Sequence, residues 1–335
     1  MLTSQQMKRP VVALTALLVG LCLPAAGGQA TSRGKLRVGF VSTAGAVPTT
    51  RTVEGAPLVG FLRAERELDI QGRVLYATQN PSEALASFAR QRYDLVIDAF
   101  PYANPVDSVA TKFPRVRFQL TDAPFETLRH RPKNVQGSIY RAEEAGYLAG
   151  YLAALMEGRT KGRHVVSAVG GFAVPGVTMW TAGYAAGARK ADPGVVVRIG
   201  YSNDFVNTAK CKRVALSQIA QGSGVVFNVA GACGLGTLQA AKERGVWAIG
   251  VDFDQSYLGR HILTSAVIRR DRGVFDSVQR LMRGHFTTGG NTVFDLRNDF
   301  VGLGRISPEV PTSFLRRVES VRKAIIAGRI SVPRG

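Results

Sequence analysis

Two doubly wound α/β lobes, each a parallel sheet with helices on both faces, are the fold that the sequence predicts. Short apolar runs alternate with amphipathic stretches along the chain, which is typical of parallel strands joined by crossover helices. The alternation occurs twice in series, over about residues 36–135 and 138–262. The chain has 335 residues, 45% of them hydrophobic and 20% charged, which is enough for two cores of ordinary domain size.

The first unit contains four apolar runs that predict buried strands, at residues 36–41, 74–77, 95–97 and 116–120. Amphipathic stretches between them predict helices at residues 60–68 and 81–91. Asn80 or Ser82 precedes or opens the second helix and is a candidate N-cap. Because each helix lies between two strands, we expect the strands to pair in parallel.

The second unit repeats this pattern with longer helices. Its predicted helices cover residues 143–156, 178–190, 208–221 and 237–243. Its predicted strands cover residues 164–169, 195–201, 225–229 and 246–251.

The tail adds a strand at residues 263–267, a helix near 273–283, an extended stretch at 291–303 and a helix at 311–327. We expect residues 31–137 with about 263–310 to form an N-terminal lobe. Residues 138–262 with about 311–335 would form the C-terminal lobe. A ligand cleft is expected between the two.

Residues 1–30 have the three parts of a secretory signal peptide. Lys8 and Arg9 supply positive charge, residues 11–23 are apolar, and residues 28–30 end in a small-x-small cleavage pattern. The apolar stretch is shorter than the roughly 20 residues that a membrane span needs. We therefore expect an exported, periplasmic product. Lipid anchoring at Cys22 is an alternative, although Leu21 stands where such signals carry a small residue.

Composition excludes several classes of protein. The 43 Lys and Arg residues against 24 Asp and Glu give a net charge of +19, but the basic residues are scattered and no nucleic-acid-binding motif accompanies them. The four histidines are isolated, so no metal site is expected. Cys211 and Cys233 remain after the leader, and their spacing leaves open whether they pair.

Candidate ligand residues follow the predicted strands, because ligands of open α/β sheets bind beyond the carboxyl ends of the strands. Glycines permit close approach, aromatic rings can stack on a flat ring, and a carboxylate such as Asp252 can accept hydrogen bonds from a vicinal diol. This combination favours a nucleoside-like polar ring compound. The candidates at these positions are Ser42, Thr43, Phe100, Phe205, Gly231 and Asp252.

An enzymatic function has weaker support. Residues 231–252 approximate a dinucleotide-binding unit, but the glycines fall as GxxGxG rather than GxGxxG. The sequence lacks a GxSxG elbow, a Walker lysine and a kinase motif set. We therefore predict no catalytic residues and no cofactor. Asp252 has a structural alternative, as a turn or helix-capping residue.

From residue 143 onward the sequence resembles the basic membrane protein family of ABC-transporter substrate-binding proteins, whose members include purine-nucleoside receptors. The segments that carry the resemblance include EEAGYLAGYLAALM (143–156), AGACGLGTLQAAKERG (230–245), IGVDFDQSYL (249–258) and IIAGRISVP (325–333). The resemblance implies a type I periplasmic binding protein fold. It also implies a receptor that delivers a small solute to the transmembrane subunits of a permease. We expect it to act as a monomer.

Residue by residue, the resemblance implies that Asp252 binds the ribose as the acid of the GVD motif. It places Phe100, Trp180 and Phe205 at or near the aromatic positions that sandwich the base, and Gly231 in the glycine loop. Trp180 and Tyr184 lie four residues apart on a predicted helix, so packing within the lobe is the alternative for Trp180. Phe205 has a similar alternative at the entry to a helix.

Two departures from the family pattern weaken the assignment to purine nucleosides. Residues 42–47 read STAGAV where relatives carry an Asp-x-Ser-Phe-Asn-like stretch. The lysine expected near Ile268 is absent, and Arg269 and Arg270 follow. The sequence thus predicts a solute receptor of an ABC importer. A sensor for a membrane receptor and an exported α/β enzyme are the alternatives.

Overall fold

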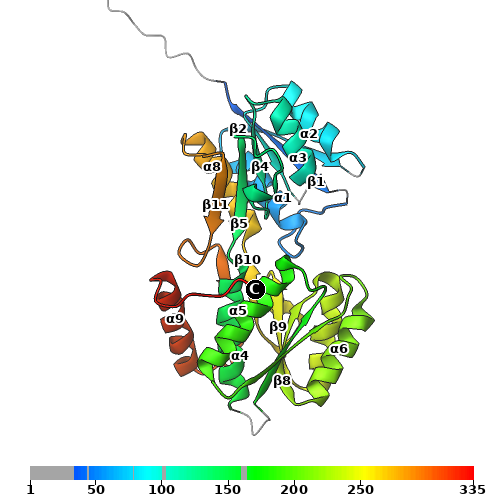
Figure 1. Ribbon diagram of the computed structural model, residues 1–335, viewed down its shortest axis with the longest axis vertical. Helices are drawn as coiled ribbons and strands as arrows, with labels where there is room; N and C mark the ends of the chain where they lie inside the picture. Colours follow the sequence, from blue (N-terminus) through cyan, green and yellow to red (C-terminus); the bar gives the residue numbers. More distant parts are fainter. Residues whose placement is uncertain (1–33, 44, 78, 100–102, 160–163) are drawn as a thin grey trace, which may run out of the picture. The chain divides into compact units, whose positions relative to one another are not determined.

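The computed structural model describes residues 34–335 except 44, 78, 100–102 and 160–163 (Figure 1). Residues 35–335 form one compact unit. The signal segment with Cys22, and the candidate Phe100, lie outside the described residues. None of the helices in the described ranges combines the length and apolar composition that a membrane crossing requires.

The first sheet has six parallel strands in the order β11-β5-β4-β3-β1-β2. These are β1 (Leu36–Thr43), β2 (Ile70–Ala77), β3 (Leu95–Asp98), β4 (Arg117–Leu120), β5 (Val135–Tyr140) and β11 (Gly290–Phe294). Helices α1 (Gly55–Glu67) and α8 (Arg270–Met282) pack on one face, and α2 (Pro81–Arg90) and α3 (Ala103–Lys112) on the other. The sheet is therefore covered on both sides, as its apolar strands require.

The second sheet has the order β12-β10-β9-β8-β6-β7, with β12 as its antiparallel edge strand. Its strands are β6 (Val165–Gly170), β7 (Val196–Tyr201), β8 (Ser223–Val229), β9 (Trp247–Asp252), β10 (Ile262–Ile268) and β12 (Val301–Leu303). One face packs against α4 (Ala142–Glu157), α5 (Pro175–Ala191) and α9 (Thr312–Ile326). The other carries α6 (Thr208–Ala220) and α7 (Leu235–Arg244). The predicted α/β class with two parallel-dominated sheets is confirmed.

Local sequence signals account for several element boundaries. The Asn80 side chain accepts a hydrogen bond from the Glu83 amide at 3.0 Å and caps α2, with Pro81 at the first helical position. At its C-terminal end, α7 stops at Gly245, whose left-handed φ of 65° is typical of a glycine that terminates a helix.

The elements of the C-terminal tail are divided between the two sheets in a way that differs from the expectation. The stretch 263–310 was expected in the N-terminal lobe as a whole, but β10 and β12 pair within the second sheet, and only α8 and β11 join the first. The extended stretch 291–303 is two strands that belong to different sheets. Strand β10 continues the parallel order after β9, because its apolar side chains complete the second core.

Three connections join the sheets: β5 to α4, β10 to α8, and β11 to β12. They are hydrogen bonded to one another. The Arg141 amide donates to the Phe294 carbonyl at 2.9 Å, and the Arg269 amide donates to the Phe300 carbonyl at 2.8 Å. The three crossings therefore lie side by side.

Candidate ligand site

The carboxyl edge of the second sheet carries a pair of exposed aromatic side chains. Phe172, which follows β6, is 39% exposed. Phe205, which follows β7, is 40% exposed. Their ring centroids are 5.1 Å apart at an interplanar angle of 60°. A Cβ on Gly171 would lie 2.2 Å from the Phe205 ring, so the glycine is needed for this ring position. The pair offers an apolar surface against which a flat ring can stack.

The glycine loop after β8 lies against Phe205. It forms a short 3₁₀ helix, η2 (Gly231–Gly234), and Gly231 has a left-handed φ of 54° that favours glycine. A buried disulfide joins Cys233 of this loop to Cys211 of α6, with the Cα atoms 5.6 Å apart. The Cys233 amide also donates to the Phe205 carbonyl at 2.9 Å. The disulfide therefore fixes both the glycine loop and the backbone of Phe205.

Asp252 ends β9, the strand next to β8, and its φ of 66° is left-handed. Its side chain is 16% exposed, and Oδ1 accepts a hydrogen bond from Arg270 Nη1 at 3.0 Å. Arg270 is the first residue of α8, which packs on the first sheet. This ion pair thus links the two sheets of the molecule.

Asp122 completes a three-residue charge cluster. It follows β4, and its Oδ2 accepts hydrogen bonds from Arg270 Nε at 2.9 Å and Nη2 at 2.7 Å. The Arg270 side chain is only 8% exposed. Burial by itself lowers the pKa of the guanidinium, but Asp122 and Asp252 outweigh it and raise the pKa above its usual value. Arg270 therefore stays protonated and donates to both carboxylates.

Tyr140 borders the cluster from the end of β5. Burial raises the pKa of its phenol, and the charge of Asp122 raises it further, so the hydroxyl stays protonated. A Cβ on Gly273 of α8 would lie 2.0 Å from the Tyr140 oxygen, which shows how closely the helix approaches this side chain. Tyr140 and the charge cluster are thus packed together where two of the three connections cross.

Three further predicted site residues belong to the N-terminal part of the chain. Ser42 is buried near the end of β1, and its hydroxyl has no hydrogen-bond partner among the described residues. Thr43 is the last residue of β1 and pairs with Ala77. Phe100 is not described.

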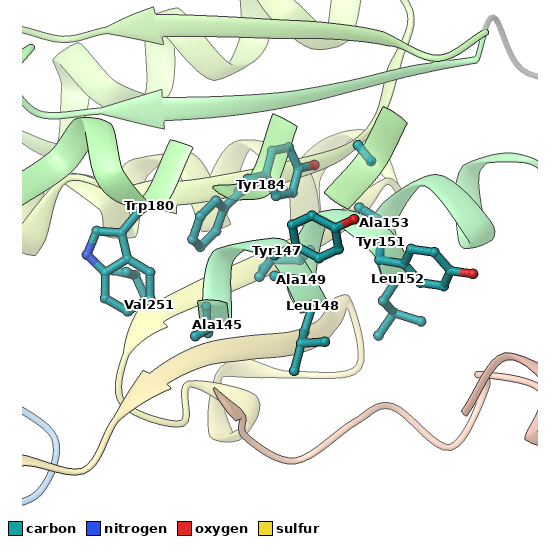
Figure 2. Close-up of a cluster of buried hydrophobic side chains, with 14 of the residues drawn as sticks. Ala145, Tyr147, Leu148, Ala149, Tyr151, Leu152, Ala153, Trp180, Tyr184 and Val251 are labelled. Carbon is teal, nitrogen blue, oxygen red and sulfur yellow. The ribbon is translucent and has the colours of Figure 1, made fainter. Parts of the chain in front are cut away.

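Trp180 lies in the core of the second lobe, near the start of α5. It is 4% exposed and makes an edge-on contact with Phe227 at 6.4 Å between ring centroids. Figure 2 shows its indole beside Val251 and Ala145. This burial favours the alternative of packing within the lobe, and stacking of Trp180 on a base stays a prediction. The structure brings together Phe205, Gly231 and Asp252 on one sheet edge and leaves Trp180 out.

Three residues that were not among the predicted site residues now belong to the candidate site: Asp122, Phe172 and Arg270. Asp122 was not among the predicted site residues, and no sequence pattern indicates its left-handed φ of 61°. Arg270 could have been singled out as a second arginine after the β10 strand. Its contact with Asp252 depends on where α8 begins.

The family model described as "ABC transporter substrate-binding protein PnrA-like" matches residues 60–335. The CD4+ T-cell-stimulating antigen of Listeria monocytogenes is 30% identical over 278 residues, which covers 76% of each chain. The ABC transporter nucleoside-binding protein BmpA of Lactococcus lactis is 29% identical over 267 residues, with 74% of this chain and 73% of that protein covered.

Solved structures with the same fold include two ABC transporter solute-binding proteins. The protein from Aeropyrum pernix superposes with a TM-score of 0.73 at 23% identity and covers 90% of this chain and 94% of its own. The protein from Conexibacter woesei gives 0.70 at 23% identity, with 89% and 99% covered. Family match, sequence relatives and fold agree, and the chain therefore belongs to the PnrA-like family of ABC transporter substrate-binding proteins, which are solute receptors and not enzymes.

Proposed function

We propose that this receptor binds a nucleoside-like polar ring compound and delivers it to the transmembrane subunits of an ABC permease. In this proposal residues 1–30 direct export to the periplasm, where the protein acts as a monomer. The relative from Lactococcus lactis supports this ligand class, since it is described as nucleoside-binding. Ligand capture would involve hinge movement at the three connections between the sheets.

The observation that carries the proposal is the arrangement of Asp252 beside an apolar stacking surface. Asp252 ends β9, Gly231 follows the neighbouring β8, and Phe172 follows β6 on the other side of β8. A compound with a flat ring and a hydroxylated ring can therefore stack at one end of this edge and donate hydrogen bonds at the other. Arg270 fixes the carboxylate through Oδ1, and Oδ2 of Asp252 has no hydrogen-bond donor among the described residues.

The proposal predicts that sugar hydroxyls are recognised through Asp252. In isothermal titration calorimetry, Asp252→Ala should weaken the binding of nucleosides about 10- to 100-fold, the usual effect of losing a hydrogen bond to a charged group. Free bases, which lack the sugar, should lose much less affinity. Ligand released from the purified wild-type protein and identified by mass spectrometry would select the compounds to test.

Two controls separate a site effect from a folding effect. Asp69→Asn removes an equivalent charge from an exposed surface pair with Lys35 and should leave binding unchanged. Asp252→Asn keeps the size of the side chain and shows how much of the loss comes from the charge. Equal nucleoside affinity for Asp252→Ala and the wild-type protein, both folded by circular dichroism, would contradict the assignment.

A further inference from the structure

A surface cavity of about 480 Å³ lies at the amino-terminal edge of the first sheet, where α2 turns into β3 and α3 turns into β4. Parallel strands place this edge opposite the carboxyl ends that carry the candidate ligand site. Tyr93 and Val116 contribute buried side chains to the lining. The volume falls within the range of small-molecule sites and exceeds that of a single small ion.

The lining of this cavity is strongly basic. Five cationic residues belong to it: Arg90, Arg92, Lys112, Arg115 and Arg117. Asp94 is the one acid in the lining, and its carboxylate accepts a hydrogen bond from the Arg37 amide at 2.8 Å. Among the described residues, Arg90 alone of the five cations has a carboxylate within ion-pair distance, that of Glu83. Four cations therefore face the cavity region without an acidic partner.

Helix termini explain only part of this charge. Arg90 and Lys112 are the last residues of α2 and α3, where a cation stabilises the helix dipole. Arg92 and Arg115 lie beyond the helix ends, and Arg117 is the first residue of β4. These three arginines are in positions that the helix dipoles do not require.

Arg92 also adopts a backbone conformation that is unfavourable for its residue type. Its φ is 55°, in the left-handed region, just after the C-terminus of α2. Glycine is the residue that usually occupies such a position, because a Cβ there is strained. An arginine at this position places a guanidinium at the cavity in spite of the strain, which is a common feature of binding sites.

We propose that this cavity binds phosphate groups. A guanidinium donates two parallel hydrogen bonds to phosphate oxygens, and several unpaired cations in one cavity favour an anion with more than one negative charge. The volume accommodates an oligophosphate or a phosphate ester. Phosphate of this kind comes either from a free oligophosphate or from the headgroup of an anionic phospholipid. The site is separate from the solute site and does not depend on the identity of the solute.

The test uses the full chain and two probes. Calorimetry with sodium tripolyphosphate measures binding of the free anion, and co-sedimentation with phosphatidylglycerol–phosphatidylcholine vesicles measures binding of headgroups. Arg92→Gly should weaken binding of at least one probe about tenfold, as expected for the loss of one charge-assisted hydrogen-bonding group. The melting temperature of Arg92→Gly should stay the same or rise, because glycine relieves the strain at this position.

Arg131→Gly is the matched control. Arg131 also has a left-handed φ, of 46°, but does not line the cavity, so the variant loses the same charge and relieves the same kind of strain. Loss of tripolyphosphate binding in Arg92→Gly alone identifies free phosphate as the ligand, and loss of vesicle binding alone identifies the headgroup. Binding of neither probe by the wild-type protein, or an equal loss in both variants, would overturn the proposal.

Discussion

Asp122 and Asp252 both have left-handed backbone conformations, and both accept hydrogen bonds from Arg270. Each ends or follows a strand, one in each sheet. A left-handed φ is unfavourable for residues other than glycine, although aspartate tolerates it better than most. Here the turn directs each carboxylate at a guanidinium that is almost fully buried. The cluster therefore links the two sheets and also holds Asp252, the candidate ligand-binding carboxylate, in position.

At this scale we expect removal of the arginine to be strongly destabilising. Arg270→Met would leave two partly buried carboxylates without their cation, and breaking such a pair costs about 3 kcal/mol. Urea unfolding would measure the loss. The double variant Arg270→Met/Asp252→Asn should be more stable than Arg270→Met, because it carries one uncompensated charge fewer.

Arg272→Met provides the comparison. Arg272 pairs with Asp299 at 2.9 Å on the surface, and an exposed pair contributes about 1 kcal/mol or less. Similar losses of stability in Arg270→Met and Arg272→Met would show that the buried cluster is no more important than a surface pair.

Among the elements, α4 and α5 pack closely together through glycines on both helices. A Cβ on Gly150 would lie 1.9 Å from the Tyr184 carbonyl oxygen, and one on Gly187 would lie 1.9 Å from the Tyr147 carbonyl oxygen. Each helix therefore approaches the backbone of the other. Figure 2 shows the aromatic side chains of both helices around this contact. The segment EEAGYLAGYLAALM thus has a structural role besides its value as a family motif.

Gly150→Ala should separate these helices and lower stability. The added methyl group would clash with the Tyr184 carbonyl oxygen, and overpacking of this kind costs about 1–3 kcal/mol. Thermal unfolding would measure the change. The same substitution at Gly176, in the first turn of α5, meets open space and should leave the melting temperature unchanged or raise it. An unchanged melting temperature for Gly150→Ala would contradict the packing argument.

On the scale of the whole molecule, the three crossings carry buried acids as well as backbone hydrogen bonds. Glu144 lies in the first turn of α4, and its Oε2 accepts a hydrogen bond from the Leu296 amide at 2.9 Å. Burial raises the pKa of the Glu144 carboxyl, and this outweighs the opposing effects of that hydrogen bond and of Arg141. Asp295 and Glu143 raise it further.

A pH dependence of stability follows from this raised pKa. The folded protein keeps the Glu144 proton at pH values where the unfolded chain, with a pKa near 4.5, has lost it. The contribution of Glu144 to the free energy of unfolding therefore falls as the pH rises from about 4.5 through the raised pKa. Glu144→Gln removes this titration and keeps an oxygen that can accept from Leu296.

Denaturant unfolding at a series of pH values checks this prediction. The difference in unfolding free energy, variant minus wild type, should become more positive between pH 4 and pH 7. Glu319→Gln, at an exposed acid on α9, is the matched control for replacing a glutamate by glutamine. A difference for Glu144→Gln that is constant or falls over this range would show that the folded-state pKa is not raised.

The sequence by itself determined the α/β class, most strands and helices, and the family, because apolar periodicity and motif residues are local properties. It did not reveal β5 or α3. The β5 segment VQGSIY alternates polar residues with apolar ones, and Gln136 and Ser138 are buried inside the sheet all the same. Only packing in the sheet decides that such residues become interior.

The tertiary structure alone decided which side chains meet. It paired Cys211 with Cys233, placed Trp180 in the core, and brought Asp122 and Arg270 to Asp252. Each of these outcomes depends on the distance between segments that are far apart in the chain, and on backbone conformations such as the left-handed aspartates. The pattern of residues along the chain predicts neither these distances nor these backbone conformations, because it reflects local preferences and not the positions of neighbouring elements.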